Sequence, residues 1–446
     1  RRRIIYSHPM KKLFYLLVLL SASVLGQEID FRGRSEIVLQ QFVKNEFLNI
    51  YKQIDTASIS KIDTASIAKS WKNLIQQNGK YVKNLKVEKS QQGNFEVYAY
   101  TLQFEKNEIT FRLIWGTNKK IKGYYFTPVD KRPKYQVPSY HNAAAAKEKK
   151  VLLTTGEFRI PGSLVIPNTP GKHPVVILVH GSGANDRDET FGPLKPFRDL
   201  TSGLTAQGIA VLRFEKRTRI FKSKMSHYSP NYTVKQEVLE DVQRAIEVAK
   251  ADTSIDTTQI YICGHSFGGM MLPRIAKENP SIKGLIYLTP NARRLEDLFV
   301  AQAEYIANEI TDPARKKAVV DSIKVLRDKV KSLSSNAAVD SSRIFDSPVS
   351  LWYELRNYDP IETAKTLDMP MLFIFGGRDY QVTSIDSDKW FSSFKSNEKA
   401  AFKMYPNLNH FLIAGEGKSL PAEYEKPGNV DEGLINDIST WIKGVK

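Results

Sequence analysis

The segment QIYICGHSFGG, residues 259–269, decides the fold of this chain. Its first five residues, Gln259–Cys263, predict a buried strand, and the glycine-rich turn after them leads into a segment that we expect to be helical. The turn matches G-x-S-x-G, in which a serine stands on a sharp strand-to-helix bend and its neighbours must be small. We therefore expect Ser266 to be a nucleophile, and a purely structural turn is the alternative.

Outward from this segment, apolar strands alternate with helices. We expect an opening hairpin of Val151–Phe158 with Ser163–Ile166. Five more strands are expected at Val175–Val179, Ile209–Phe214, Leu285–Leu288, Met371–Phe375 and Ala401–Tyr405. Two helices are expected at Val234–Ala251 and Val430–Ile442. Such an alternation predicts a mostly parallel sheet with helices on both faces. The stretch between Leu288 and Met371 is too long for an ordinary crossover. We expect it to form a helical cap at about 291–367.

The first third of the chain has a different pattern. The chain has 446 residues, which suggests two domains. Residues 35–87 have helical spacing of apolar residues, and residues 94–128 alternate as antiparallel strands. We therefore expect a small α+β domain of unknown role at 27–130, a linker at 131–149, and an α/β domain at 150–446.

Residues 1–26 are typical of a secretory signal peptide. Lys11 and Lys12 precede the apolar run Leu13–Leu20, and mostly small residues follow up to Gly26. Met10 is the natural start under this interpretation. The sequence therefore predicts a secreted or periplasmic protein, and an uncleaved membrane anchor is the alternative.

Composition limits the classes of partner and cofactor. The formal net charge is +17, and five of these charges lie within residues 1–26. The remaining basic residues are scattered among acidic ones, with no basic helix, so we expect no nucleic-acid partner. Cys263 is the only cysteine, which excludes an intrachain disulfide and a cysteine metal site. No metal and no cofactor is expected.

A serine nucleophile needs a general base and an acid that orients it. In the α/β-hydrolase order, the acid and then the histidine follow the serine. His410 is the only histidine after Ser266, and Asp379 directly follows the strand Met371–Phe375. Asp386 and Asp388 are rival acids, and Asp379 could instead form a turn or pair with Arg378.

Two backbone N–H groups are needed to stabilise an oxyanion. One is expected at Phe267, directly after the nucleophile, and the other at Ser182, in the loop that follows Val175–Val179. His180 is expected to position this loop. The charged stretch Asn185–Glu189 either binds substrate or fixes the loop through internal ion pairs.

Four motifs together resemble secreted bacterial α/β hydrolases of the EstD-like esterase group. They are HGSGANDRDET at 180–190, GHSFGG at 264–269, GGRDYQV at 376–382 and NLNHF at 407–411, and AEYEKPGNVD at 422–431 also fits. The resemblance covers about residues 150–446. It implies an α/β-hydrolase fold with a triad of Ser266, Asp379 and His410, which cleaves a small-molecule carboxylic ester.

Other functions stay open on this evidence. A serine peptidase or aminopeptidase and an acyl-CoA thioesterase can use the same triad, and a non-catalytic binding protein can keep the scaffold. In the cap, Trp352 and Tyr353 offer either an aromatic surface for an apolar substrate or the core of the cap itself. The sequence does not indicate an oligomeric state.

Overall fold

A computed structural model describes residues 30–59, 62–228, 230–334 and 342–445. The chain divides into two compact units, with the boundary between Lys131 and Arg132. The expected signal peptide at 1–26 lies outside the described residues. Within the described ranges, no helix is both long and apolar enough to cross a membrane.

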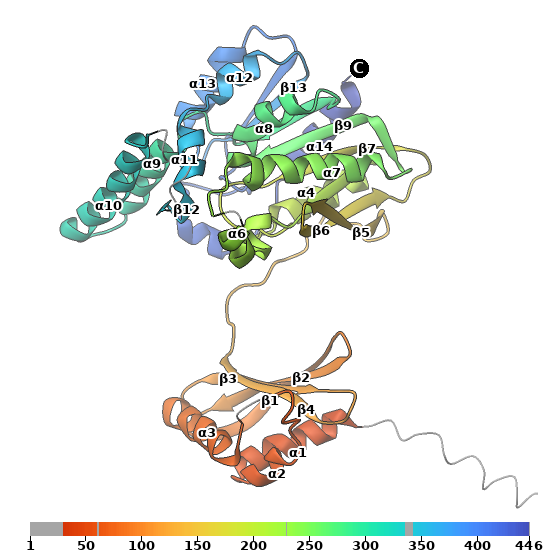
Figure 1. The fold of residues 1–446 in the computed structure, drawn as a ribbon, viewed down its shortest axis with the longest axis vertical. Coiled ribbons are helices and arrows are strands. Elements are labelled where there is room, and N and C mark those ends of the chain that lie inside the picture. Colours follow the sequence, from red (N-terminus) through yellow and green to blue (C-terminus); the bar gives the residue numbers. More distant parts are fainter. Residues whose placement is uncertain (1–29, 60–61, 229, 335–341, 446) are drawn as a thin grey trace, which may run out of the picture. The chain divides into compact units, whose positions relative to one another are not determined.

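The first unit is an α+β domain, as expected. Three helices pack on an antiparallel sheet with strand order β1-β2-β3-β4 (Figure 1). Their bounds are α1 Phe31–Val43, α2 Phe47–Tyr51 and α3 Thr64–Asn78, then β1 Tyr81–Gln92, β2 Phe95–Phe104, β3 Glu108–Trp115 and β4 Ile121–Pro128. The core is aromatic: the ring of Phe42 packs against the rings of Trp71 and Phe111.

The expectation of helix over residues 35–87 is wrong at its end, because residues 81–87 belong to β1. This strand lies at the edge of the sheet and is mostly exposed. Backbone pairing with β2, for example Val87 opposite Tyr100, holds it in place. A strand held in this way buries few side chains, so its sequence has no clear apolar alternation.

The second unit is built on an eight-stranded sheet with the order β14-β13-β10-β9-β7-β8-β6-β5. The strands are β5 Ala146–Thr155, β6 Phe158–Pro167, β7 His173–Val179, β8 Ala210–Phe214, β9 Ile255–His265, β10 Gly284–Leu288, β13 Met371–Gly376 and β14 Ala400–Tyr405. The strands β14, β13, β10, β9, β7 and β8 are parallel, while β6 and β5 close one edge as an antiparallel hairpin. This order is that of the expected α/β-hydrolase fold.

The strand β5 begins at Ala146, inside the segment 131–149 that we expected to be a linker. Its first residues, AKEKK, are polar, and Lys147–Lys150 pair with Ser163–Ile166 of β6. As on β1, backbone hydrogen bonds hold this edge strand. A polar edge strand resembles a linker in sequence, because its side chains face solvent.

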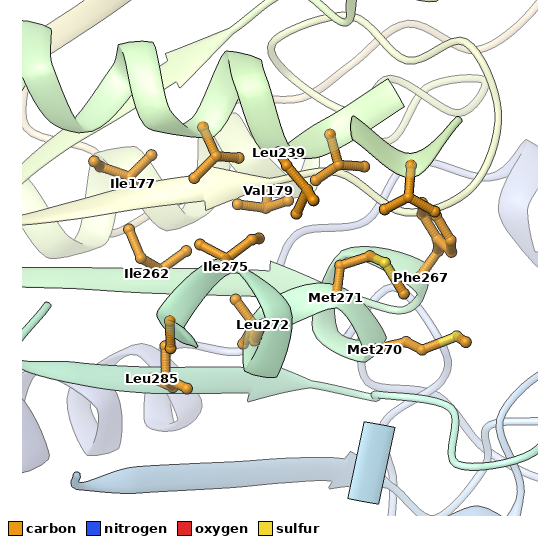
Figure 2. Close-up of a cluster of buried hydrophobic side chains, with 14 of the residues drawn as sticks. Ile177, Val179, Leu239, Ile262, Phe267, Met270, Met271, Leu272, Ile275 and Leu285 are labelled. Carbon is orange, nitrogen blue, oxygen red and sulfur yellow. The ribbon is translucent and has the colours of Figure 1, made fainter. Parts of the chain in front are cut away.

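Helices cover both faces of the sheet. On one face, α4 (Pro196–Ala206) and α14 (Glu432–Gly444) pack against Val176 and Leu178 of β7. On the other face, Ile177 and Val179 meet side chains of α8 (Phe267–Glu278) and of the turn that leads into α7 (Glu240–Lys250), as Figure 2 shows. Adjacent residues of β7 thus enter opposite cores, because successive side chains of a strand alternate between faces. The other helical segments of this layer are α5 Arg217–Ile220, α6 Lys222–Tyr228, the π-helical turn Lys235–Leu239 and α13 Ser384–Phe394.

The insertion between β10 and β13 forms the expected helical cap. It contains α9 Leu295–Ala307, α10 Pro313–Lys331, the short hairpin β11 Arg343–Ile344 with β12 Ser347–Pro348, α11 Val349–Arg356 and α12 Pro360–Lys365. Trp352 is buried in this cap, where its ring packs against Phe299 and Phe345 and its Nε1 donates to the carbonyl of Ile344 at 2.6 Å. Trp352 is therefore part of the cap core.

Candidate active site

Ser266 stands on the bend between β9 and α8. Its backbone has φ +52° and ψ −117°, a conformation that non-glycine residues rarely adopt. The bend is tight because Gly268 packs against the carbonyl oxygens of Val179 and His180, where a side chain would collide. The N–H of Ser266 donates to the carbonyl of Leu288 at 2.9 Å and so ties the bend to β10. Such strain is kept where the surrounding structure determines it, and it is concentrated at functional sites.

His410 and Asp379 form a buried pair at the ends of neighbouring strands. The Nδ1 atom of His410 lies 2.7 Å from Oδ2 of Asp379. The other carboxylate oxygen of Asp379 accepts from the N–H groups of Gln381 at 2.7 Å and Val382 at 2.9 Å. Three donors therefore hold this carboxylate, and an imidazole that donates from Nδ1 keeps Nε2 as an acceptor.

The rival acids lie elsewhere. Asp386 accepts from the backbone N–H of Ala292 and pairs with Arg293 at 2.6 Å, which anchors the start of the cap. Asp388 is exposed on α13. Arg378 pairs with Glu423 at 2.8 Å, so it does not neutralise Asp379.

Ser266 and His410 line the same cavity, which has a volume of about 330 Å³. Ser182 also lines it, and the cap helix α9 contributes one wall. Aromatic side chains form much of the lining, namely Phe191, Phe299, Tyr380, Phe411 and Tyr424. The ring of Tyr380 stacks on Tyr305 of α9 at a centroid distance of 4.8 Å, which ties the cap to the loop that carries Asp379.

The two expected oxyanion donors are Phe267, directly after Ser266, and Ser182, which lines the same cavity as Ser266. Phe267 is the first residue of α8, and the first N–H groups of a helix have no acceptor within it. In the loop after β7, the carbonyl of Gly181 accepts from Nζ of Lys216 at 2.9 Å and from Nδ2 of Asn185 at 3.2 Å. Because the peptide between Gly181 and Ser182 is trans, the Ser182 N–H points away from Lys216.

His180 is buried next to this loop but does not line the cavity. Burial lowers its pKa to about 4, so the ring is neutral at pH 7. It packs against the rings of Phe197 and Phe214 at centroid distances of 5.3 and 5.4 Å. These contacts agree with the expected role in positioning the loop.

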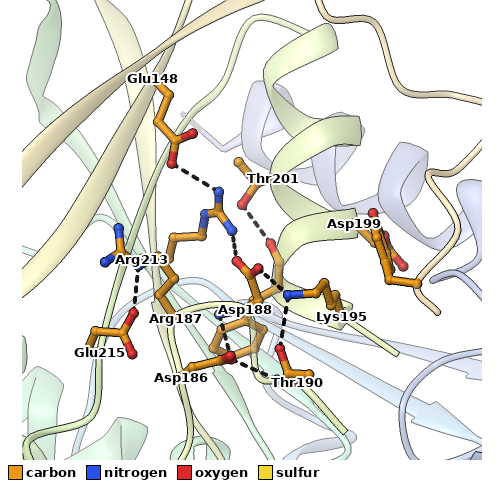
Figure 3. A network of polar contacts seen from close by, with 12 residues as sticks. Glu148, Asp186, Arg187, Asp188, Thr190, Lys195, Asp199, Thr201, Arg213 and Glu215 are labelled. Carbon is orange, nitrogen blue, oxygen red and sulfur yellow. Dashed lines mark hydrogen bonds and ion pairs between the residues drawn. The ribbon is translucent and has the colours of Figure 1, made fainter. Parts of the chain in front are cut away.

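Within the charged stretch Asn185–Glu189, the side chains of Arg187 and Asp188 are held by ion pairs, as Figure 3 shows. Asp188 pairs with Arg213 and, at 2.9 Å, with Lys195. Arg187 pairs with Glu215 at 2.8 Å. Within this stretch, only Asn185 and Glu189 line the cavity.

Two features of the site were not predicted from the sequence. Lys216 is an isolated lysine after β8, and Glu189 pairs with His265, a residue within the serine motif itself. No spacing rule connects these residues, because Glu189 follows β7, Lys216 follows β8 and His265 ends β9. Among the residues that the structure describes, no three of the types His, Cys, Asp and Glu are grouped as metal ligands.

Both units of the chain are similar to known protein families. Residues 172–417 match the family described as "Serine aminopeptidase, S33", and residues 35–124 match a family described as a protein of unknown function. The chain is 32% identical to Esterase EstD of Thermotoga maritima over 433 residues, which are 97% of this chain and all of that protein.

Two further similarities are more distant. The chain is 27% identical to the putative esterase NocK of Nocardia uniformis over 159 residues, which are 35% of this chain and 42% of that protein. The solved structure of Est1E from Butyrivibrio proteoclasticus is 16% identical in sequence to this chain. The matched region covers 66% of this chain and 96% of that chain, with a TM-score of 0.41. On the evidence of the family match and the EstD relative, this chain is an α/β hydrolase that belongs to the serine aminopeptidase S33 family.

Proposed function

We propose that this hydrolase cleaves carboxylic esters through an acyl-enzyme on Ser266, with His410 as general base and Asp379 as the acid that orients it. The observation that carries the proposal is the buried pair of His410 and Asp379, at 2.7 Å, beside a cavity that His410 shares with the strained Ser266. The EstD relative supports an ester as substrate.

In this mechanism, Nε2 of His410 takes the proton of the Ser266 hydroxyl as its oxygen attacks the ester carbonyl. The Phe267 and Ser182 N–H groups donate to the oxyanion of the tetrahedral intermediate. His410 then returns the proton to the leaving alcohol, and the acyl group stays on Ser266. A water that His410 deprotonates attacks the acyl-enzyme, which releases the acid and restores the serine.

The lining of the cavity favours an uncharged substrate. Among the residues that the structure describes, those that line it include no lysine and no arginine. A thioester of coenzyme A carries phosphates, which proteins bind mostly with such cations. Of the described residues that line the cavity, only Glu189 carries a carboxylate, and it already faces Gly181 and His265. An aminopeptidase needs an available anion for the substrate ammonium group, so the lining supports an ester with an apolar or aryl acyl group.

A substrate panel with two variants tests the proposal. The wild-type protein is expected to hydrolyse p-nitrophenyl esters faster than aminoacyl anilides or acyl-CoA thioesters. Ser266→Ala is expected to lose about 10⁴–10⁶-fold in kcat, by comparison with protease triads, and the exposed Ser392→Ala is expected to lose nothing. Full ester turnover by folded Ser266→Ala refutes the proposal. If the wild-type protein hydrolyses an anilide or a thioester faster than the esters, the proposed substrate class is wrong and that compound's class takes its place. A chain that turns over none of the substrates, and whose Ser266 does not react with a fluorophosphonate, is a binding protein.

We also propose that the protein is exported. Lys11, Lys12 and the apolar run Leu13–Leu20 support this proposal. N-terminal sequencing of the protein recovered from its host is expected to begin near Gln27. Recovery of a chain that retains Leu13–Leu20 favours an anchor instead.

A further inference from the structure

A buried ion pair lies directly behind the proposed catalytic residues. The Nδ1 atom of His265 faces Oε2 of Glu189 at 3.0 Å, and both side chains are about 5% exposed or less. Among the described residues, neither of these two atoms has a hydrogen-bond partner in another group. Glu189 comes from the loop after β7, while His265 is the last residue of β9, one position before Ser266. The pair therefore joins the loop after β7 to the end of β9, directly before Ser266.

Glu189 also holds the loop of the proposed oxyanion hole. Its second oxygen, Oε1, accepts from the N–H of Gly181 at 2.6 Å. Since Lys216 holds the carbonyl of Gly181 from the other side, this residue is fixed through both of its backbone polar groups. The peptide group between Gly181 and Ser182 carries the Ser182 N–H. The position of Glu189, which holds Gly181, therefore affects the direction in which this N–H points.

The backbone of Glu189 is itself constrained. Its φ is +52°, in the left-handed region that a glutamate rarely occupies. The preceding Asp186 accepts from the N–H groups of Asp188 and Thr190, and Asp188 is held by Arg213 (Figure 3). This network stabilises the unusual conformation and directs Glu189 toward Gly181 and His265.

On its other side, His265 holds the loop of the proposed base. Its Nε2 lies 2.9 Å from the carbonyl oxygen of His410, which can only accept, so Nε2 carries a proton. Burial alone acts to lower the pKa of His265, but the charge and hydrogen bonding of Glu189, together with the His410 carbonyl and Asp379, raise it overall. For Glu189, burial alone acts to raise the pKa, but His265 together with other groups around the carboxylate, among them the Gly181 N–H, lowers it overall. Both directions favour an imidazolium paired with a carboxylate.

We propose that Glu189 and His265 act as a positioning pair, which fixes the loop of the oxyanion hole relative to the loop of the general base. The link runs from the N–H of Gly181 through Glu189 and His265 to the carbonyl of His410. This inference rests on the proposed function, since it assigns both loops a part in one reaction. The pair does not touch the reacting atoms, so it acts on kcat through geometry.

The variant Glu189→Gln tests the link with little change in shape. An amide oxygen can still accept from Gly181, but the charge that holds His265 is lost. We expect kcat for a p-nitrophenyl ester to fall about 10- to 100-fold, because small displacements of catalytic groups have effects of this size. KM is expected to stay within about twofold, since substrate binding relies on the aromatic lining. The matched control is Glu354→Gln, which takes a partly buried carboxylate away from Arg274 in the cap, far from this loop in the sequence, and does not line the cavity.

Substitutions of His265 test the same link from its other end. His265→Gln keeps a donor for the His410 carbonyl, whereas His265→Leu keeps none, so kcat is expected to fall in the order wild type, Gln, Leu. Combining Glu189→Gln with His265→Gln is expected to cost no more than the larger single effect, because the two residues act as a unit. If Glu189→Gln does not fold, the two His265 variants decide by the same criteria.

The outcomes separate this proposal from the proposed function. If the wild type turns over the ester and Ser266→Ala does not, while folded Glu189→Gln keeps its kcat, the positioning role is wrong and the function stands. A loss confined to KM, or an equal loss of kcat in the control Glu354→Gln, also overturns it. If Ser266→Ala retains turnover, the proposed function itself fails.

Discussion

The Nδ1 atom of His410 lies 2.7 Å from Oδ2 of Asp379, although the two residues are 31 positions apart. They meet because β13 and β14 are parallel neighbours, so the loops that follow them leave the same edge of the sheet. Ser266 follows β9 at that edge as well. The order of the strands thus brings together three side chains that are far apart in the sequence.

The first prediction concerns Asp379→Asn. The amide keeps the size of the side chain, but it does not favour the Nδ1–H form of His410 in the same way. We expect kcat to fall about 10³–10⁴-fold, as in serine-protease triads, with a circular dichroism spectrum like that of the wild type. Asp437→Asn on α14, outside the cavity lining, serves as the matched control. A loss of less than tenfold in folded Asp379→Asn contradicts the assigned role.

The second prediction concerns the bend that carries Ser266. In Gly268→Ala, the added methyl group collides with the carbonyls of Val179 and His180, which are backbone atoms of β7 and its loop. We expect a loss of stability of about 1–3 kcal/mol or more, typical of overpacking. Gly444→Ala, at the end of α14, meets no atom within 4 Å and is expected to leave stability unchanged. Thermal denaturation of both variants checks this, and equal melting temperatures would show that the bend is not tightly packed.

The third prediction concerns the aromatic wall. Phe191 is 51% exposed, and its ring stacks on Phe411 at a centroid distance of 5.3 Å. Phe191→Ala is expected to raise KM about 5- to 10-fold for an aryl ester, through loss of apolar contact area, and to leave acetate esters nearly unaffected. Phe391→Ala removes a phenyl group of the same exposure from α13 and is the control. An equal change in KM for aryl and acetate esters argues against an aryl subsite at this wall.

The fourth prediction concerns pH. Burial lowers the pKa of His180 to about 4, whereas an unfolded histidine titrates near 6.5. Between these two values the unfolded chain binds the proton and the folded chain does not, so acidification through this range favours unfolding. The stability due to His180 is complete above about pH 6.5 and falls by about 1–2 kcal/mol on going to pH 5.

Denaturant titrations at several pH values measure this effect. His180→Gln has no titrating group at the site, so its stability is expected to fall less steeply between pH 6.5 and 5 than that of the wild type. The exposed His141→Gln is expected to keep the wild-type slope. Parallel curves for wild type and His180→Gln would mean that His180 titrates normally.

Much of the fold can be predicted from the sequence, because the central strands are buried on both faces and read as continuous apolar runs. The strand Val175–Val179 is an example: alternate residues enter the two cores. The two errors, at β1 and at the start of β5, both fall on edge strands. An edge strand is held by backbone hydrogen bonds to one neighbouring strand, and many of its side chains face solvent. Its sequence therefore lacks the apolar pattern by which a strand is predicted.

The same distinction applies to the site. Ser266, Asp379 and His410 could be named because strand ends and chain order restrict the choice. Glu189 and Lys216 could not, because their roles depend on how separate loops meet around Gly181. No local pattern encodes such a meeting, and only the folded arrangement reveals it.

The most direct test of the account is to trap the covalent intermediate. Acid quenching of the wild-type protein during turnover of a p-nitrophenyl ester, followed by mass spectrometry, is expected to show one acyl group on the peptide that contains Ser266. The same experiment with Ser266→Ala is expected to show none. Turnover by the wild type with an acyl group on another residue, or sustained turnover by folded Ser266→Ala, would contradict the account.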